Sequence, residues 1–137
     1  MEVARVPFFI SDIFAGFAKI HGIMIVTPEQ LIFEYQMSDN VFGAISGKIA
    51  KRAVGYGELA AVESATGFFK PRLIFRAKGL ETFSKFPHRD PSLFCIRVSW
   101  KNRKLIKPAL AEIGLNLSFA EADRFRERIA SPQDGES

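Results

Sequence analysis

The sequence predicts a single α+β domain in which an antiparallel sheet is followed by helix. Short β-prone runs with alternating apolar and polar residues extend from Lys19 to Trp100, and the period then becomes helical. Strands first and helices last favour an antiparallel sheet over alternating βαβ units. The length of 137 residues fits one domain of common size.

The N-terminal residues predict an extension, residues 1–16, that precedes the main domain, residues 17–130. Ser11 is a suitable N-cap residue, and the residues after it place Ile13, Phe14 and Phe17 on one stripe. This pattern predicts a short helix that starts at Ser11.

A β-hairpin is the clearest early element. Lys19–Thr27 and Leu31–Gln36 are β-prone runs, and the Pro28 between them sets the backbone angle of a turn. The following segment, Ser38–Gly55, is punctuated by glycine and carries both apolar and basic residues. It is either a long loop or a pair of strand ends joined by a turn.

Four more strands are expected before the chain becomes helical. Their limits are Tyr56–Glu63, Phe68–Ala77, Leu80–Phe86 and Leu93–Trp100. In the last of them Cys95 lies between two apolar residues, which predicts a small buried side chain.

Two helices are expected at the end of the chain. Asn102–Ile113 has a helical apolar pattern that Pro108 should break or kink, and Gly114 supplies a stop. Ser118 and Glu121 then form a capping-box pattern ahead of Phe119, Ala122, Phe125 and Ile129 at helical spacing. Residues 131–137 are polar and predict a disordered tail.

The order of strands resembles that of bacterial pleckstrin-homology-like domains and the related GRAM domains. The resemblance rests on the hairpin Gly22–Glu34 and on the run Gly55–Glu63, and it covers roughly Phe17 to Ile129. It implies a bent antiparallel barrel of about seven strands, with a C-terminal helix that caps one end. The turn Pro28-Glu29-Gln30 carries no cation, unlike the basic first loop of phosphoinositide-binding relatives, which disfavours inositol-phosphate recognition by that route.

Composition disfavours several classes of function. One cysteine allows no internal disulfide, and neither His21 nor His88 has a partner at metal-ligand spacing. No nucleophile completes a triad with His88, Arg89 and Asp90, and no phosphate-binding glycine motif follows a strand. We therefore expect no enzyme, no cofactor, no metal and no small-molecule substrate, and a cytoplasmic protein that can lie at the inner face of the membrane.

The net charge of +4 conceals a basic segment between residues 70 and 107. Only Glu81 and Asp90 oppose its eleven cations, which are Lys70, Arg72, Arg76, Lys78, Lys85, Arg89, Arg97, Lys101, Arg103, Lys104 and Lys107. Such a segment attracts anionic lipid, nucleic acid or an acidic protein, or is simply a solvated face. Nucleic acid is disfavoured because the 14 phenylalanines are better explained as core.

Two surfaces are candidates for binding. The first is the apolar and basic segment that contains Phe42, Lys48, Lys51 and Arg52. The second combines Phe69, Lys70 and Arg72 with Lys101, Arg103 and Lys104, which would share one end of the barrel. The leading hypothesis is a non-catalytic binding or assembly module that acts through protein–protein contact or self-association. The alternative is a peripheral membrane adaptor that binds anionic lipid through its basic surface.

Overall fold

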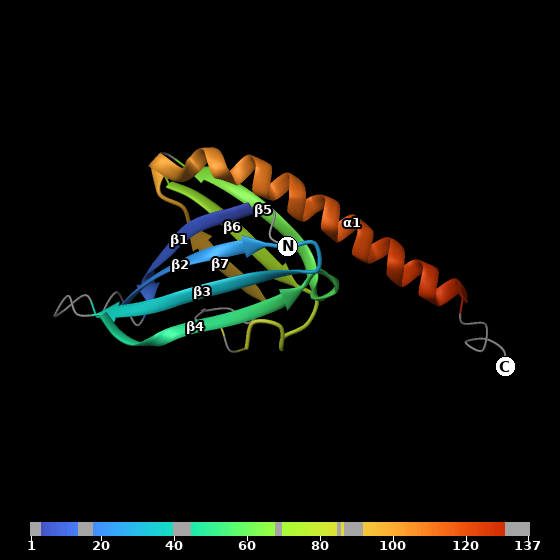
Figure 1. The fold of residues 1–137 in the computed structure, drawn as a ribbon, viewed down its shortest axis with the longest axis horizontal. Coiled ribbons are helices and arrows are strands. Elements are labelled where there is room, and N and C mark those ends of the chain that lie inside the picture. The colour runs from blue at the N-terminus through green and yellow to red at the C-terminus, as the bar shows by residue number, and fades with distance from the viewer. Residues whose placement is uncertain are drawn as a thin grey trace.

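The computed structural model describes residues 4–13, 18–39, 45–67, 70–84, 86 and 92–130. These residues form seven strands followed by one long helix (Figure 1). The elements are β1 (Ala4–Ile13), β2 (Ala18–Val26), β3 (Gln30–Asp39), β4 (Ile45–Gly55), the 3₁₀ turn η2 (Tyr56–Glu58), β5 (Leu59–Gly67), β6 (Lys70–Ala77), β7 (Leu93–Arg97), the 3₁₀ turn η3 (Trp100–Leu105) and α1 (Ile106–Ala130).

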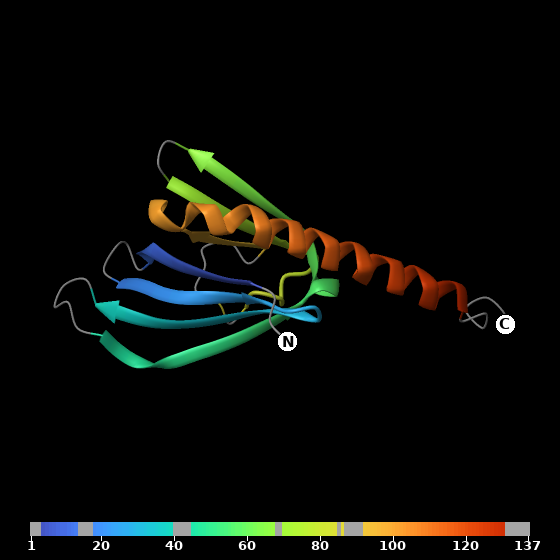
Figure 2. The same cartoon turned by 45° about the horizontal axis from the view of Figure 1, so that its top comes forward.

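All the strands belong to one antiparallel sheet of order β4-β3-β2-β1-β7-β6-β5. The prediction of an α+β fold with an antiparallel sheet is confirmed. The sheet curves strongly, but β4 and β5 remain its two edges, so the expected barrel is not closed (Figure 2). For the segment Ser38–Gly55, both a loop and paired strands were expected as alternatives. Its described part contains the end of β3 and all of β4, and β4 pairs with β3.

The concave side of the sheet holds a core rich in phenylalanine. Residues alternate along each strand, so that Leu73 and Phe75 are buried while Arg72 and Arg76 are exposed. Phe33 lies at the centre and makes edge-to-face ring contacts with Phe8, Phe75, Phe86 and Phe94, at centroid distances of 6.0, 5.4, 5.6 and 5.3 Å.

The connection between β6 and β7 also fills this core. We expected a strand over Leu80–Phe86, and this prediction is wrong. The described part of the segment consists of bends and a turn, with backbone bonds from Ser84 N to Glu81 O and from Phe86 N to Phe83 O. Phe83 and Phe86 are buried against Phe94, because a turn can direct both rings inward where a strand would alternate them.

The two expected C-terminal helices are one continuous helix, α1. Pro108 lies in its first turn, where no backbone N–H is needed, so it causes no break. Gly114 lies in the middle, and the Ser118 hydroxyl donates to the Gly114 carbonyl at 3.1 Å instead of capping a helix start. The predicted stop at Gly114 and the capping box at Ser118 are therefore wrong.

Two further expectations about the strands need correction. Residues 4–13 of the expected extension form β1, which lies inside the sheet between β2 and β7, so this part belongs to the sheet and no helix starts at Ser11. Cys95 is exposed, because its outward position on β7 alternates with the buried Phe94 and Ile96. Residues 14–17, where that helix was to continue, and the expected tail, residues 131–137, lie outside the described residues.

A buried polar cluster fixes α1 against the sheet. The Tyr56 hydroxyl donates to the Thr27 carbonyl at 2.6 Å. Asn116 Nδ2 donates to the same carbonyl at 3.2 Å and to the Tyr56 hydroxyl at 3.1 Å. These three residues lie in the β2–β3 turn, η2 and α1, so the cluster joins three parts of the chain and sets the position of the helix.

Candidate functional site

The sequence-predicted binding residues lie in two separate parts of the sheet. Phe42 and Phe69 lie outside the described residues. Lys48, with Lys51 and Arg52, lies on the edge strand β4, whereas Lys70 and Arg72 lie on β6. Four strands, β3, β2, β1 and β7, separate β4 from β6, so the two groups do not form one surface.

The β4 residues do not all face the same side. Lys51 is exposed, and its ammonium nitrogen lies 3.9 Å from a carboxylate oxygen of Glu34. Arg52 alternates with it, and its Nε atom is buried without a hydrogen-bond partner among the described residues. Burial raises the pKa of the neighbouring Tyr35 hydroxyl, and the positive charge of Arg52 partly opposes this effect. Arg52 is therefore a half-buried packing residue, and Lys51 is partly neutralised.

The other predicted group is continuous with η3. The Val98 N–H donates to the Pro71 carbonyl at 3.0 Å, which holds the start of β6 beside the chain that leads into η3. Lys101, Arg103 and Lys104 are exposed on η3. The Arg103 guanidinium lies 4.0 Å from the centre of the half-exposed Trp100 ring. Cations and one aromatic ring thus lie together at this end of the sheet.

An arginine pair lies on the convex side of the sheet near the same end. Arg72 of β6 and Arg97 of β7 are direct cross-strand partners. Like charges in this position repel each other. Arg97 is also opposite Phe9 of β1, whose ring lies 5.6 Å from the Lys19 ammonium. This arrangement provides a local concentration of positive charge for an anionic partner.

Half of the large apolar side chains that are exposed among the described residues lie on α1. The helix crosses the sheet with its first half and extends beyond it with its second half (Figures 1 and 2). Its first half buries Ile106, Ala109, Ile113 and Asn116. Residues 121–129, by contrast, are all exposed.

Apolar residues form a second stripe on the other side of this helix. We call this set the outer stripe; it consists of Leu115, Phe119, Ala122, Phe125 and Ile129. At about 100° per residue, these positions span an arc of about 120° and lie roughly opposite Ile106 and Ile113. The four large side chains are 49%, 59%, 63% and 66% exposed, in chain order.

The side of α1 that faces the sheet becomes charged where the helix leaves it. Arg124 and Glu127 continue the side of Ile113 by helical geometry, and both are exposed. Near this point the Glu121 carboxylate forms an ion pair with Lys78, which follows β6, at 2.7 Å, and this pair lowers the pKa of the Glu121 carboxyl. The apolar side of the projecting half is therefore the outer one, which the sheet cannot cover.

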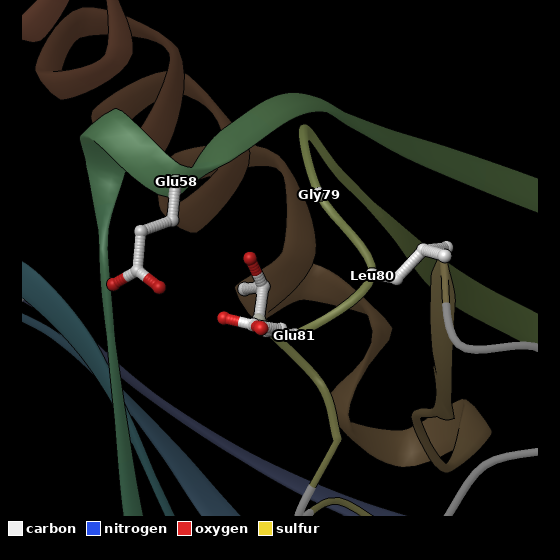
Figure 3. Close-up of a pocket in the computed structure, with 5 residues that line it drawn as sticks. Glu58, Gly79, Leu80 and Glu81 are labelled. Atoms are coloured by element: carbon white, nitrogen blue, oxygen red, sulfur yellow. The ribbon is translucent and has the colours of Figure 1, made fainter.

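A surface depression of about 600 Å³ lies between η2 and the turn that follows β6. It is lined by Glu58, Gly79, Leu80, Glu81 and Thr82. Figure 3 shows the carboxyl groups of Glu58 and Glu81 at the gap between the two segments. Glu58 already accepts a hydrogen bond from the Gly55 N–H at 3.1 Å, so it serves the local turn. The depression lacks the apolar enclosure of a small-molecule site.

Within the part of the chain that the structure describes, no group of three or more histidine, cysteine, aspartate or glutamate side chains is placed to hold a metal ion. No helix among the same residues combines the length and the apolar character needed to cross a bilayer.

The sequence predicted that the residues of the outer stripe share a helix face, but not that this face is exposed. The spacing of Phe119, Ala122, Phe125 and Ile129 predicts an apolar helix face correctly, but that face was expected to cap the barrel. The sequence nevertheless contained a signal for two opposite apolar faces, because Ile106, Ala109 and Ile113 fall on the side opposite the outer stripe once the helix is continuous through Gly114.

Comparison with protein-family models, with curated proteins and with solved structures finds no match for this chain.

Proposed function

We propose that this chain is a non-catalytic binding or assembly module that acts through protein–protein contact, and that the outer stripe of α1 is its contact surface. The observation that carries the proposal is the exposure of Phe119, Phe125 and Ile129 on a helix half that projects from the sheet. Large apolar side chains that gather on a projecting element mark interaction sites in soluble proteins. Phenylalanine is also a strong contributor at the buried centre of interfaces.

The architecture supports a wider assignment within the same proposal. The resemblance to bacterial pleckstrin-homology-like domains implies a bent antiparallel barrel of about seven strands with a C-terminal helix; the number of described strands and the position of the helix agree with it, although the sheet is not closed. That scaffold serves lipid, peptide and protein binding, so the fold alone does not choose among partners. The choice of protein contact rests on the outer stripe.

Site-specific photo-cross-linking in cells that express the full chain tests this function. A benzophenone amino acid at position 119 should give adducts with protein, because this position lies in the outer stripe. The same probe at position 127 is the matched control, since Glu127 is exposed on the same helix half but on its charged side. Absence of protein adducts from position 119, or equal adducts from both positions, would refute the proposal.

A second candidate function is contact with an anionic surface such as a membrane. Its support is the arginine pair, in which Arg72 of β6 lies directly opposite Arg97 of the adjacent strand β7. An anionic group between them would relieve their repulsion, and exposed Lys101 and Lys104 lie on the adjoining η3 turn. This surface is separate from the outer stripe, so the two functions are compatible.

Flotation with anionic and neutral vesicles at two salt concentrations tests the second candidate. Binding should occur only with anionic vesicles and should weaken as salt rises, because exposed charges are screened over about 8–10 Å at physiological ionic strength. Arg72→Glu should reduce it, whereas Lys51→Glu, on the far edge strand, should not. Equal flotation with neutral vesicles would rule out the arginine pair as the reason for binding.

A further inference from the structure

The spacing of the outer stripe is symmetric about Ala122. Phe119 and Phe125 lie three residues on either side of it, and Leu115 and Ile129 lie seven residues on either side. An antiparallel helix pair reverses the order of residues along one partner. A stripe with this symmetry therefore presents the same succession of side chains to a reversed copy of itself.

From this symmetry we infer that the partner of the outer stripe is a second copy of this chain, docked antiparallel about a two-fold axis through Ala122. This inference rests on the proposed function and specifies its partner. A two-fold axis makes an interface self-complementary, with each contact occurring twice. Leu115 of each copy then faces Ile129 of the other, and the Phe119 rings lie level with the Phe125 rings. The small Ala122 side chains meet at the centre, where they allow close approach of the helices.

The antiparallel direction also separates like charges. Arg126 lies within the arc of the outer stripe, four residues after Ala122, and forms an ion pair with Asp123 at 3.1 Å within its own helix. In a parallel pair in register, the two Arg126 side chains would lie at the same level and repel each other. In the antiparallel pair they are eight residues apart along the axis, a separation of about 12 Å. Charge therefore favours the reversed pairing.

The rest of the domain leaves room for this arrangement. The sheet contacts the side of α1 that carries Ile106, Ala109 and Ile113, roughly opposite the outer stripe. A second helix on the outer stripe would place its own sheet on the far side, giving the layer order sheet, helix, helix, sheet. With the axis at Ala122, residues 114–130 of the two helices overlap, so the projecting halves lie mainly along each other.

The available area implies a weak dimer. Four phenylalanine rings of about 200 Å² each, exposed by roughly 60%, contribute about 500 Å². The four aliphatic side chains bring the total to the order of 1,000 Å², which is near the lower limit for a specific interface. We therefore expect dissociation in the micromolar range or above, with dimer increasing with concentration.

Sedimentation of the purified full chain, from about 1 µM to about 1 mM, measures this equilibrium. The expected result is a reversible monomer–dimer equilibrium. Ala122→Glu and Ala122→Lys should each raise the dissociation constant by roughly 100-fold or more, because each places two like charges at the centre. An equimolar mixture of the two variants should dimerise again through the opposite charges. A strict monomer over the whole range, or a mixture that stays monomeric, would overturn the inference.

Disulfide trapping distinguishes the direction of the pairing. In a Cys95→Ser background, Ala122→Cys should cross-link to itself, and Leu115→Cys should cross-link only when it is mixed with Ile129→Cys. Glu127→Cys is the control and should remain uncross-linked, since it lies on the other side of the helix. Self-cross-linking of Leu115→Cys alone would show parallel helices and overturn the antiparallel arrangement. Circular dichroism of each variant confirms that α1 is retained.

The two proposals fail in different ways. If cross-linking from position 119 yields an adduct with a different protein while the purified chain stays monomeric, the contact function stands and self-docking is refuted. If position 119 yields no protein adduct and the purified chain is monomeric, both are refuted. An adduct with the mass of two chains, together with the sedimentation result above, supports both.

Discussion

Removal of one buried hydroxyl group, by Tyr56→Phe, should measurably weaken the attachment of α1 to the sheet. The Tyr56 hydroxyl donates to the Thr27 carbonyl at 2.6 Å and accepts from Asn116 Nδ2 at 3.1 Å. The ring itself stays buried in the variant, so apolar burial is unchanged. The Thr27 carbonyl also keeps its bond from Asn116, at 3.2 Å, so no acceptor is left without a partner.

The expected loss is therefore that of two hydrogen bonds without an orphaned carbonyl. At about 0.5–1.5 kcal/mol for each bond, we expect the free energy of unfolding to fall by about 1–3 kcal/mol. With a urea dependence near 2 kcal/mol per M, the urea midpoint should fall by roughly 0.5–1.5 M. Urea denaturation followed by far-ultraviolet circular dichroism measures this shift.

A second hydroxyl deletion provides the control. Ser118→Ala removes an exposed hydroxyl that donates to the Gly114 carbonyl inside α1, and it should change stability by less than about 0.5 kcal/mol. If Tyr56→Phe unfolds at the same urea concentration as the original chain, the polar cluster does not hold the helix. A loss of more than about 1 kcal/mol in Ser118→Ala would instead indicate the helix start that the sequence pattern suggested.

Four other outcomes are expected. Burial raises the pKa of the Tyr56 hydroxyl above its ordinary value of 10.0. The stability that the protonated hydroxyl contributes is therefore complete below pH 10 and is lost as the pH rises through the folded-state pKa. The difference in unfolding free energy between the original chain and Tyr56→Phe should accordingly shrink above pH 10. Gly114→Ala should raise the unfolding free energy by roughly 0.5–1 kcal/mol, because a Cβ there meets no atom within 4 Å in mid-helix; a loss of stability would show that the helix is interrupted. Gly22→Ala should lower it by roughly 1–3 kcal/mol, since a Cβ would lie 2.7 Å from the Tyr35 Cβ and 2.9 Å from the Phe8 ring; unchanged thermal unfolding would contradict this packing. Exposed Cys95 should react with a thiol reagent in the native protein at a rate within roughly tenfold of the urea-unfolded chain, and strong protection would place it in the core after all.

Local patterns in the sequence determined much of the fold. Alternation along the hairpin, with Leu31, Phe33 and Tyr35 on one side, predicts strands β2 and β3 and the side that is buried. The same reasoning works at β7 for Phe94 and Ile96. It does not reach Cys95, because a cysteine fits either side of a strand and only the register of the sheet chooses between them. The fold class followed from these local signals because strand and helix periods differ.

Tertiary contacts decided what local signals left open. Phe83 and Phe86 read as part of a strand, but burial of both rings beside Phe94 makes the segment a turn. Gly114 and Ser118 suggest the end of one helix and the start of another. The helix nevertheless continues through both residues, because Ile106 and Ile113 before Gly114 pack in the core and Asn116 after it is hydrogen-bonded to the Thr27 carbonyl. The outer stripe exists only because that helix is continuous and longer than the sheet that it covers. The sequence alone determined that Phe119, Phe125 and Ile129 share a helix face, whereas their exposure depends on where the sheet ends, which the three-dimensional arrangement of all seven strands sets.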